Sequence, residues 1–134
     1  MTSPSVFVVE DDALLAWALS AQLEDLGYEV AGTARTAGYA VAAVLRLAPS
    51  LVLMDIRLAG DATGLDAARR IRAWSAMPIL FCSAYADLPG VAAEVQRIGN
   101  ARLIGKPVTN ADLRHHLAAL LEPGAARERV VAAE

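Results

Sequence analysis

Several charged and polar residues that could do chemistry stand directly after short apolar runs of this 134-residue sequence. Where such runs form the parallel strands of an α/β sheet, ligands bind outside the carboxyl ends of the strands. Side chains at those ends would therefore meet at one edge of the sheet. They are Glu10, Asp11 and Asp12 after the run 6–9, Asp55 after 51–54, Ser83 after 79–82 and Lys106 after 102–105.

This combination of side chains favours phosphoryl transfer. Carboxylates gathered at one place repel one another unless a cation neutralises them, and Mg²⁺ prefers oxygen ligands while keeping several waters. With Mg²⁺ and Lys106 offsetting negative charge and Ser83 donating a hydrogen bond, the Asp55 carboxylate could accept a phosphoryl group as an acyl phosphate. Read singly, the motifs have plainer explanations, because Asp11 or Asp12 could cap a helix and Lys106-Pro107 could be an ordinary turn.

The elements that must position these residues are apolar runs alternating with segments of helical period. Uninterrupted apolar strands that alternate with helices imply a parallel sheet covered on both faces. We expect strands at 6–9, 28–31, 51–54, 79–82 and 102–105, and helices at 13–26, 36–48, 63–74, 91–98 and from 109 to about 120.

Apolar residues at helical spacing should face the sheet, and two helix starts carry capping signals. Thr63 with Asp66 has the form of a capping box, and Thr109 with Asp112 caps the last helix. The residues expected to face inward are Leu15, Leu19, Leu23 and Leu26 in the first helix, Val41, Val44 and Leu45 in the second, Val91, Val95 and Ile98 in the fourth, and Leu113, Leu117 and Leu120 in the last.

Composition limits the class of protein. We expect one domain over residues 1–122 and a short tail over 123–134, with no output domain. A formal net charge of −3 argues against nucleic acid as a partner, since backbone binding needs a cationic face. No apolar stretch is long enough to span a bilayer, and the single cysteine, Cys82, fits a reducing compartment. We therefore expect a cytoplasmic protein without membrane association.

Over about residues 5–121 the sequence resembles the receiver domains of response regulators in two-component signalling. The resemblance implies a flavodoxin-like, doubly wound (βα)5 fold with a five-stranded parallel sheet of order 2-1-3-4-5. It also implies a phosphoprotein of the phosphorelay that signals by protein contact and is not an enzyme in its own right. The motifs that carry it are Val8-Val9-Glu10-Asp11-Asp12, Leu53-Met54-Asp55-Ile56-Arg57, Phe81-Cys82-Ser83-Ala84 and Gly105-Lys106-Pro107.

The resemblance assigns a role to each residue of the motifs. Asp55 would be the phosphoacceptor, taking its phosphoryl group from a phosphohistidine of a sensor histidine kinase or a histidine phosphotransfer protein. The remaining roles are Mg²⁺ binding by Asp11, Asp55 and the Arg57 carbonyl, with Glu10 acting through water; phosphoryl binding by Ser83 and Lys106; access to the site at Ala84; and an influence of Tyr85 on phosphate loss.

Some positions depart from the family pattern or suggest a contact surface. Leu103 stands where an aromatic residue is usual, so the coupling of a hydroxyl shift to an aromatic rotamer cannot operate in its standard form. Ala59 replaces the customary Pro, Thr63 a frequent Asp, and Glu10 the commoner Asp. Trp17 lies opposite the first helix's apolar stripe, and we expect it to dock the kinase together with Leu14 and Pro107.

Alternative functions fit the sequence less well. A phosphatase of the haloacid-dehalogenase type wants a second Asp two residues after the nucleophile, where Arg57 stands. A flavodoxin-like cofactor module wants a hydroxyl- and glycine-rich loop where three acids follow the first strand. A receiver cut from a hybrid histidine kinase or a DNA-binding regulator stays open beside the favoured stand-alone regulator, as do the downstream target and homodimer formation. His115, His116 and the cluster Arg69, Arg70 and Arg72 are expected to be ordinary solvated helix surface.

Overall fold

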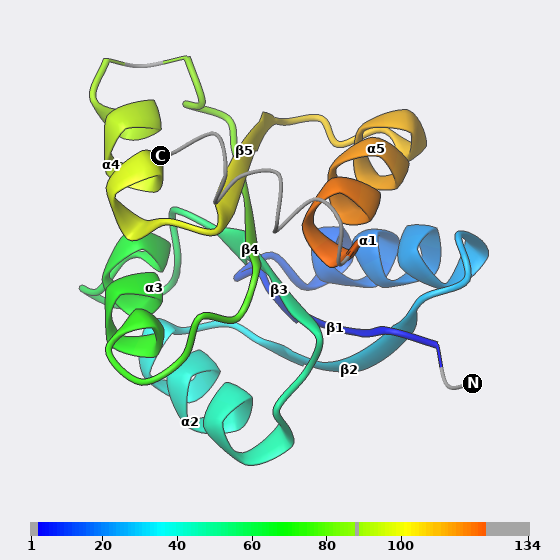
Figure 1. Cartoon of the computed structure of the whole chain (residues 1–134), viewed down its shortest axis with the longest axis horizontal. Coiled ribbons are helices and arrows are strands. Elements are labelled where there is room, and N and C mark those ends of the chain that lie inside the picture. The colour runs from blue at the N-terminus through cyan, green and yellow to red at the C-terminus, as the bar shows by residue number, and fades with distance from the viewer. Residues whose placement is uncertain (1–2, 88, 123–134) are drawn as a thin grey trace.

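Five parallel strands form a central sheet between two layers of helices in the computed structural model, which describes residues 3–87 and 89–122 (Figure 1). The strand order is β2-β1-β3-β4-β5, which confirms the expected topology. The predicted tail, 123–134, lies outside the described residues. The strands are β1 (Ser5–Val9), β2 (Glu29–Ala34), β3 (Leu51–Asp55), β4 (Ile79–Ser83) and β5 (Ala101–Gly105).

The helices divide unequally between the two faces of the sheet (Figure 1). One face is covered by α1 (Ala13–Asp25) and α5 (Asn110–Leu121), and the other by α2 (Ala37–Leu47), α3 (Gly64–Arg72) and α4 (Val91–Ile98). None of the helices in 3–87 and 89–122 has the length and apolarity that crossing a bilayer requires.

Successive side chains of the strands point alternately into two separate hydrophobic cores. Phe7 and Phe81 point into the core under α2, α3 and α4, whereas Val8 and Leu53 belong to the core under α1 and α5. Every residue of β3 and of β4 is buried, as expected for strands covered on both faces. Burying one large apolar side chain contributes about 1.5–3 kcal/mol, so these two strands anchor the sheet edge where Asp55 and Ser83 lie.

The predicted inward faces were wrong at two leucines. Leu15 is 43% exposed and Leu45 is 61% exposed. In α1 the buried positions are Ala16, Leu19 and Leu23, which turns Leu15 to the side of the helix. In α2 the small residues Ala37, Ala40 and Ala43 bring the helix close to the sheet together with Val44, and the larger Leu45 is left outside.

The edge strand β2 is longer than predicted, because it continues to Ala34 rather than ending at Ala31. Its last part lacks an apolar run, since it contains Gly32 and the exposed Thr33. A Cβ atom at position 32 would lie 3.0 Å from Cε2 of Phe7, so glycine there lets the ring of Phe7 pack against the strand. The extension places Arg35 level with the end of β1, where the acidic residues begin.

Helix caps behave as the sequence predicted. Asp12, not Asp11, is the N-cap of α1, and its carboxylate accepts hydrogen bonds from the amides of Leu14 and Leu15. Thr63 and Asp66 form a reciprocal capping box at the start of α3. Caps of this kind are worth about 1 kcal/mol each, and these two fix the directions in which α1 and α3 leave the site.

Candidate functional site

A polar pocket of about 220 Å³ opens at the carboxyl ends of β1, β3, β4 and β5. The residues predicted to bind the metal and the phosphoryl group all line it, so the structure brings the predicted set together. Asp12, which the sequence placed at this edge of the sheet, also lines the pocket, and so does Leu15, which was expected to face the sheet. The full lining is Glu10, Asp11, Asp12, Leu15, Asp55, Arg57, Ser83, Ala84, Tyr85 and Lys106.

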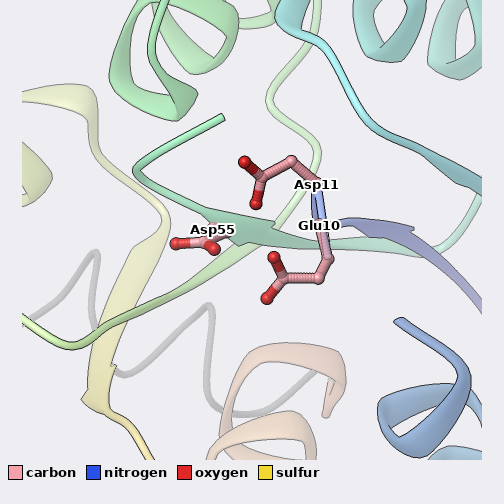
Figure 2. Close-up of side chains that lie close together, drawn as sticks. All are labelled: Glu10, Asp11 and Asp55. Atoms are coloured by element: carbon pink, nitrogen blue, oxygen red, sulfur yellow. The ribbon is translucent and has the colours of Figure 1, made fainter. Parts of the chain in front are cut away.

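Three carboxylates converge in this pocket (Figure 2). Glu10, Asp11 and Asp55 each offer an oxygen, and these oxygens all lie within 4.8 Å of one another. Glu10 and Asp55 are buried, with exposures of 1% and 4%. The three carboxylates and the Lys106 ammonium together carry a formal charge of −2. A divalent cation that prefers oxygen ligands, such as Mg²⁺, fits both this donor set and this charge.

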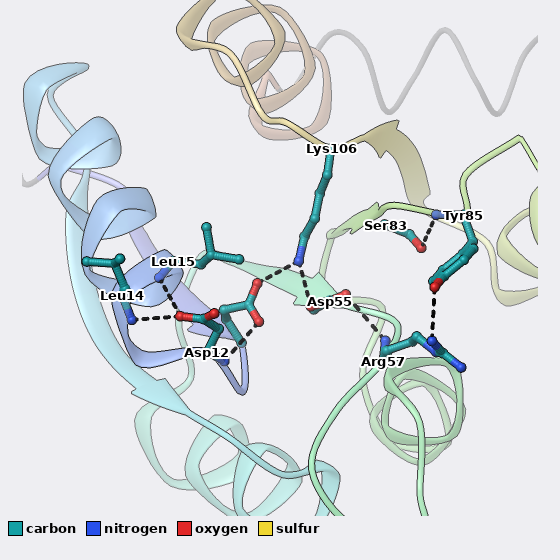
Figure 3. Close-up of polar contacts among 9 residues, drawn as sticks. Asp12, Leu14, Leu15, Asp55, Arg57, Ser83, Tyr85 and Lys106 are labelled. Atoms are coloured by element: carbon teal, nitrogen blue, oxygen red, sulfur yellow. Dashed lines mark hydrogen bonds and ion pairs between the residues drawn. The ribbon is translucent and has the colours of Figure 1, made fainter.

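Asp55 is held at the end of β3 by donors on both sides of its carboxylate (Figure 3). The amide of Arg57 donates to Oδ1 at 3.3 Å, and Nζ of Lys106 donates to Oδ2 at 2.8 Å. The start of α3 packs directly against the Asp55 main chain, because a Cβ atom on Gly64 would lie 2.0 Å from the Asp55 carbonyl oxygen. The sequence prediction missed this requirement for glycine; its only signal was a glycine placed directly after a helix cap.

Lys106 joins two of the carboxylates from the end of β5. Its Nζ donates to Oε1 of Glu10 at 2.7 Å as well as to Asp55. Partial burial alone would lower the pKa of Lys106, but the hydrogen bonds and charge attraction to Asp55 and Glu10 outweigh it and raise the pKa. The ammonium therefore stays protonated and ready to meet an arriving anion.

Asp11 is the carboxylate with least compensation. Burial, followed by its interactions with Glu10, raises its pKa above the ordinary value. No ion pair within residues 3–87 and 89–122 reaches its side chain. The pocket thus holds more negative charge than the protein itself neutralises.

The opposite wall carries groups suited to a phosphoryl oxygen. Oγ of Ser83 accepts a hydrogen bond from the amide of Tyr85 at 3.0 Å, which leaves its O–H free to donate. Nη1 of Arg57 donates to Oη of Tyr85 at 3.1 Å, and the guanidinium lies 4.8 Å from the ring centroid. Ala84 is exposed between them, so its small side chain leaves the mouth of the pocket open.

The buried thiol of Cys82 lies next to the site but takes no part in it. Cys82 is opposite Asp55 in the pairing of β3 with β4 and is 1% exposed. Burial, with a further contribution from the Asp55 charge, raises the pKa of Cys82 to about 12. It packs as a small buried apolar side chain.

The predicted docking residues belong to two segments: Leu14 and Trp17 lie on α1, and Pro107 lies in the segment after β5. Leu14 and Trp17 are 73% and 70% exposed, which confirms that Trp17 faces solvent. Pro107 lines a groove of about 470 Å³ between α1 and the segment after β5, together with Leu15 and Val108. The docking role of these residues stays a prediction.

Two residues predicted to be solvated helix surface are partly buried, His116 and Arg72. Nδ1 of His116 accepts a hydrogen bond from Nε of Arg102 at 2.8 Å. Arg72, expected on a solvated helix face, is partly buried, and burial lowers its pKa. Its guanidinium donates to the carbonyl oxygens of Met77 at 2.7 Å, Gly99 at 2.8 Å and Ile98 at 3.1 Å. The correction has a physical reason, since the end of α4 leaves carbonyl groups unpaired and an arginine can satisfy several of them.

Comparison with known proteins identifies the same family that the sequence motifs of the pocket resemble. Residues 6–118 match the sequence model of the response regulator receiver domain. The chain is 36% identical over 111 residues to the phyllosphere-induced regulator PhyR of Methylorubrum extorquens, covering 81% of this chain and 40% of that protein. It thus spans less than half of that relative.

Solved structures show the same relationship. The receiver domain of PhyR from Erythrobacter litoralis superposes with a TM-score of 0.78 and 32% identity, covering 90% of this chain and 92% of that one. A double mutant of the anti-anti-sigma factor PhyR from Bartonella quintana gives 0.73 and 28%, covering 89% and 48%.

Proposed function

Because this chain belongs to the response-regulator receiver family, we propose that it accepts a phosphoryl group on the Asp55 carboxylate in a Mg²⁺-dependent reaction. The observation that carries the proposal is the convergence of Glu10, Asp11 and Asp55 on one pocket that also holds Lys106 and Ser83. A cytoplasmic location and action as a stand-alone regulator, through contact with other proteins, are parts of the same proposal.

The Asp55 carboxylate is the nucleophile in this reaction. One of its oxygens forms a bond to phosphorus while the bond from phosphorus to the donor's imidazole nitrogen breaks, and the electron pair of that bond stays on the imidazole. The hydrogen bonds from Arg57 and Lys106 orient the carboxylate. Glu10 retains the other hydrogen bond of Lys106 and so holds the ammonium beside the new phosphoryl group.

The remaining residues bind charge and oxygen atoms. Mg²⁺, when bound, supplies positive charge to the phosphoryl oxygens; Asp11, Asp55 and the Arg57 carbonyl would hold it, and Glu10 would act through water. The Ser83 hydroxyl donates a hydrogen bond to a phosphoryl oxygen, because its own oxygen already accepts one from the Tyr85 amide. Positioning and charge compensation of this kind are the main requirements of phosphoryl transfer.

The donor and the target follow from the chemistry and from the relatives. We propose a phosphohistidine of a histidine kinase or of a phosphotransfer protein as the donor. The Bartonella quintana relative is named an anti-anti-sigma factor, which makes a protein that controls a sigma factor a second candidate partner downstream. A size measurement before and after phosphorylation would separate partner binding from homodimer formation.

Intact-mass spectrometry tests the proposal directly. The protein is incubated with a small phosphodonor with and without Mg²⁺, as the wild type, as Asp55→Asn and as the control Asp61→Asn, an exposed aspartate in the following loop. We expect one phosphoryl group on the wild type and on the control, only with Mg²⁺, and none on Asp55→Asn. No adduct under any condition on a folded wild type, with rapid quenching, would contradict the proposal.

A further inference from the structure

Arg35 joins the two loops that carry the acidic pocket. It directly follows β2, and its Nε donates to the main-chain carbonyl oxygen of Asp11 at 3.1 Å. Its own carbonyl oxygen accepts a hydrogen bond from the amide of Ala59 at 3.3 Å, and Thr36 pairs with Ala59 in an isolated parallel bridge. One residue thus contacts both the loop of Asp11 and the loop that follows Asp55.

The strand register places Arg35 in this position. Val9 is opposite Ala34 in the pairing of β1 with β2, and the amide of Glu10 donates to the Ala34 carbonyl at 2.9 Å. The next residue on each strand is then Asp11 on one side and Arg35 on the other. The sequence prediction ended β2 at Ala31 and so missed this contact.

The hydrogen bond from Arg35 differs from those of Lys106 in the atom that accepts it. Lys106 occupies carboxylate oxygens of Glu10 and Asp55. Arg35 instead donates to the Asp11 peptide carbonyl. It therefore fixes the main chain of Asp11 without occupying a carboxylate oxygen that a cation needs.

We propose that Arg35 is a positioning residue for Mg²⁺ binding, an inference that rests on the proposed function. Mg²⁺ demands nearly ideal octahedral geometry, so the carboxylates of Asp11 and Asp55 must be held in a fixed relation before it binds well. The side chain of Arg35 holds the main chain of Asp11, and the main chain of Arg35 holds Ala59. Both loops are thereby fixed to the end of β2. Ordering the loops in advance removes part of the entropic cost of binding.

The charge of Arg35 acts in the opposite direction. Arg35 lines a cavity of about 310 Å³ together with Glu10 and Trp17. A positive group near the pocket repels Mg²⁺, so its removal would tighten binding if charge were its only effect. If positioning dominates, removal weakens binding. The sign of the change therefore distinguishes the two.

The test is an NMR titration of the unphosphorylated protein with MgCl₂, following the amide signals of Asp11, Asp12 and Arg57. The variants are Arg35→Gln, Arg35→Lys and the control Arg46→Gln, an exposed arginine of α2. We expect the apparent Kd for Mg²⁺ to rise about fivefold in Arg35→Gln and to stay unchanged in the control. In Arg35→Lys the Kd should return most of the way to the wild-type value. The same spectra report whether each variant is folded.

A second readout separates positioning from general damage. With a small phosphodonor at saturating Mg²⁺, the phosphorylation rate of Arg35→Gln should lie within about twofold of wild type, since Arg35 does not touch the reacting atoms. Unchanged or tighter Mg²⁺ binding in Arg35→Gln, or no recovery in Arg35→Lys, would overturn the role of Arg35. Absence of Mg²⁺ binding by the wild type would overturn the proposed function and this inference with it.

Discussion

Two regions of the molecule concentrate charge, and they handle it differently. The acidic pocket brings three carboxylates together with one ammonium, and two of the carboxylates are buried. The seam between α3 and α4 contains Arg69 and Arg97, which pair with Glu94, and Arg72, which donates to main-chain carbonyls. In the seam every arginine has partners within the protein, whereas in the pocket negative charge is left over.

Uncompensated charge, rather than cavity size, distinguishes the proposed functional pocket from the seam. The cavity at the seam is about 390 Å³, against about 220 Å³ for the acidic pocket. The seam uses its charges to hold two helices together, and a ligand has little to add. The pocket leaves a charge for a cation to neutralise.

Loss of Lys106 should have the largest effect. Among the described residues, Lys106 is the one cation paired with Glu10 and Asp55. Lys106→Met leaves these two carboxylates without it, and we expect the free energy of unfolding to fall by about 2–3 kcal/mol. Urea unfolding measures this change in stability, and added Mg²⁺ should restore part of the lost free energy of unfolding. If the exposed-site control Arg114→Met loses as much, the pocket has no special dependence on its cation.

Loss of Arg72 should come next and should affect stability alone. Arg72→Met leaves carbonyl groups at the end of α4 and near the start of β4 without their donor, and we expect a loss of about 2 kcal/mol in the same urea assay. Arg70→Met, on the exposed side of α3, is the matched control and should change little. Phosphorylation of Asp55 should proceed as in wild type; a large loss there would mean that the seam serves the site.

The pH dependence of stability should differ in sign between one carboxylate of each region. Burial and Glu10 raise the folded-state pKa of Asp11, so its contribution is present below its ordinary value of 3.8 and is lost as pH rises through the raised pKa. The Thr63 amide lowers the pKa of Asp66, so its contribution is present above 3.8 and is lost as pH falls through the lowered value.

Thermal unfolding in EDTA from pH 3 to 7 checks this contrast with the variants Asp11→Asn and Asp66→Asn. Relative to wild type, Asp11→Asn should gain stability as pH rises, and Asp66→Asn should lose it. This effect is the smallest of the three, because both side chains are partly exposed to solvent. Parallel curves for all three proteins would remove the distinction between the two regions.

Much of the fold and the pocket could be predicted because both follow from local patterns. Apolar runs located all five strands, and the residues after them met at one edge because parallel strands end together. Leu45 was misplaced because small alanines, not large leucines, occupy the buried face of α2. Gly64 and Arg35 were missed because their roles depend on main-chain contacts with segments distant in sequence, for which no local pattern exists.

Arg72 was misjudged for a related reason. Its position beside Ile71 puts it at the margin of the buried face of α3, where a long side chain can turn either outward or along the helix end. Which way it turns is decided by carbonyl groups of α4 and of the segment before β4.

The position of Cys82 has a practical consequence. It is the sequence's single thiol, and it lies near the carboxyl end of β4, paired with the residue that is expected to be phosphorylated. A thiol that is buried and protonated does not react with alkylating reagents until the strands around it separate. The rate of alkylation therefore measures how fast β3 and β4 separate. The unmodified protein can thus report how phosphorylation or Mg²⁺ changes that rate.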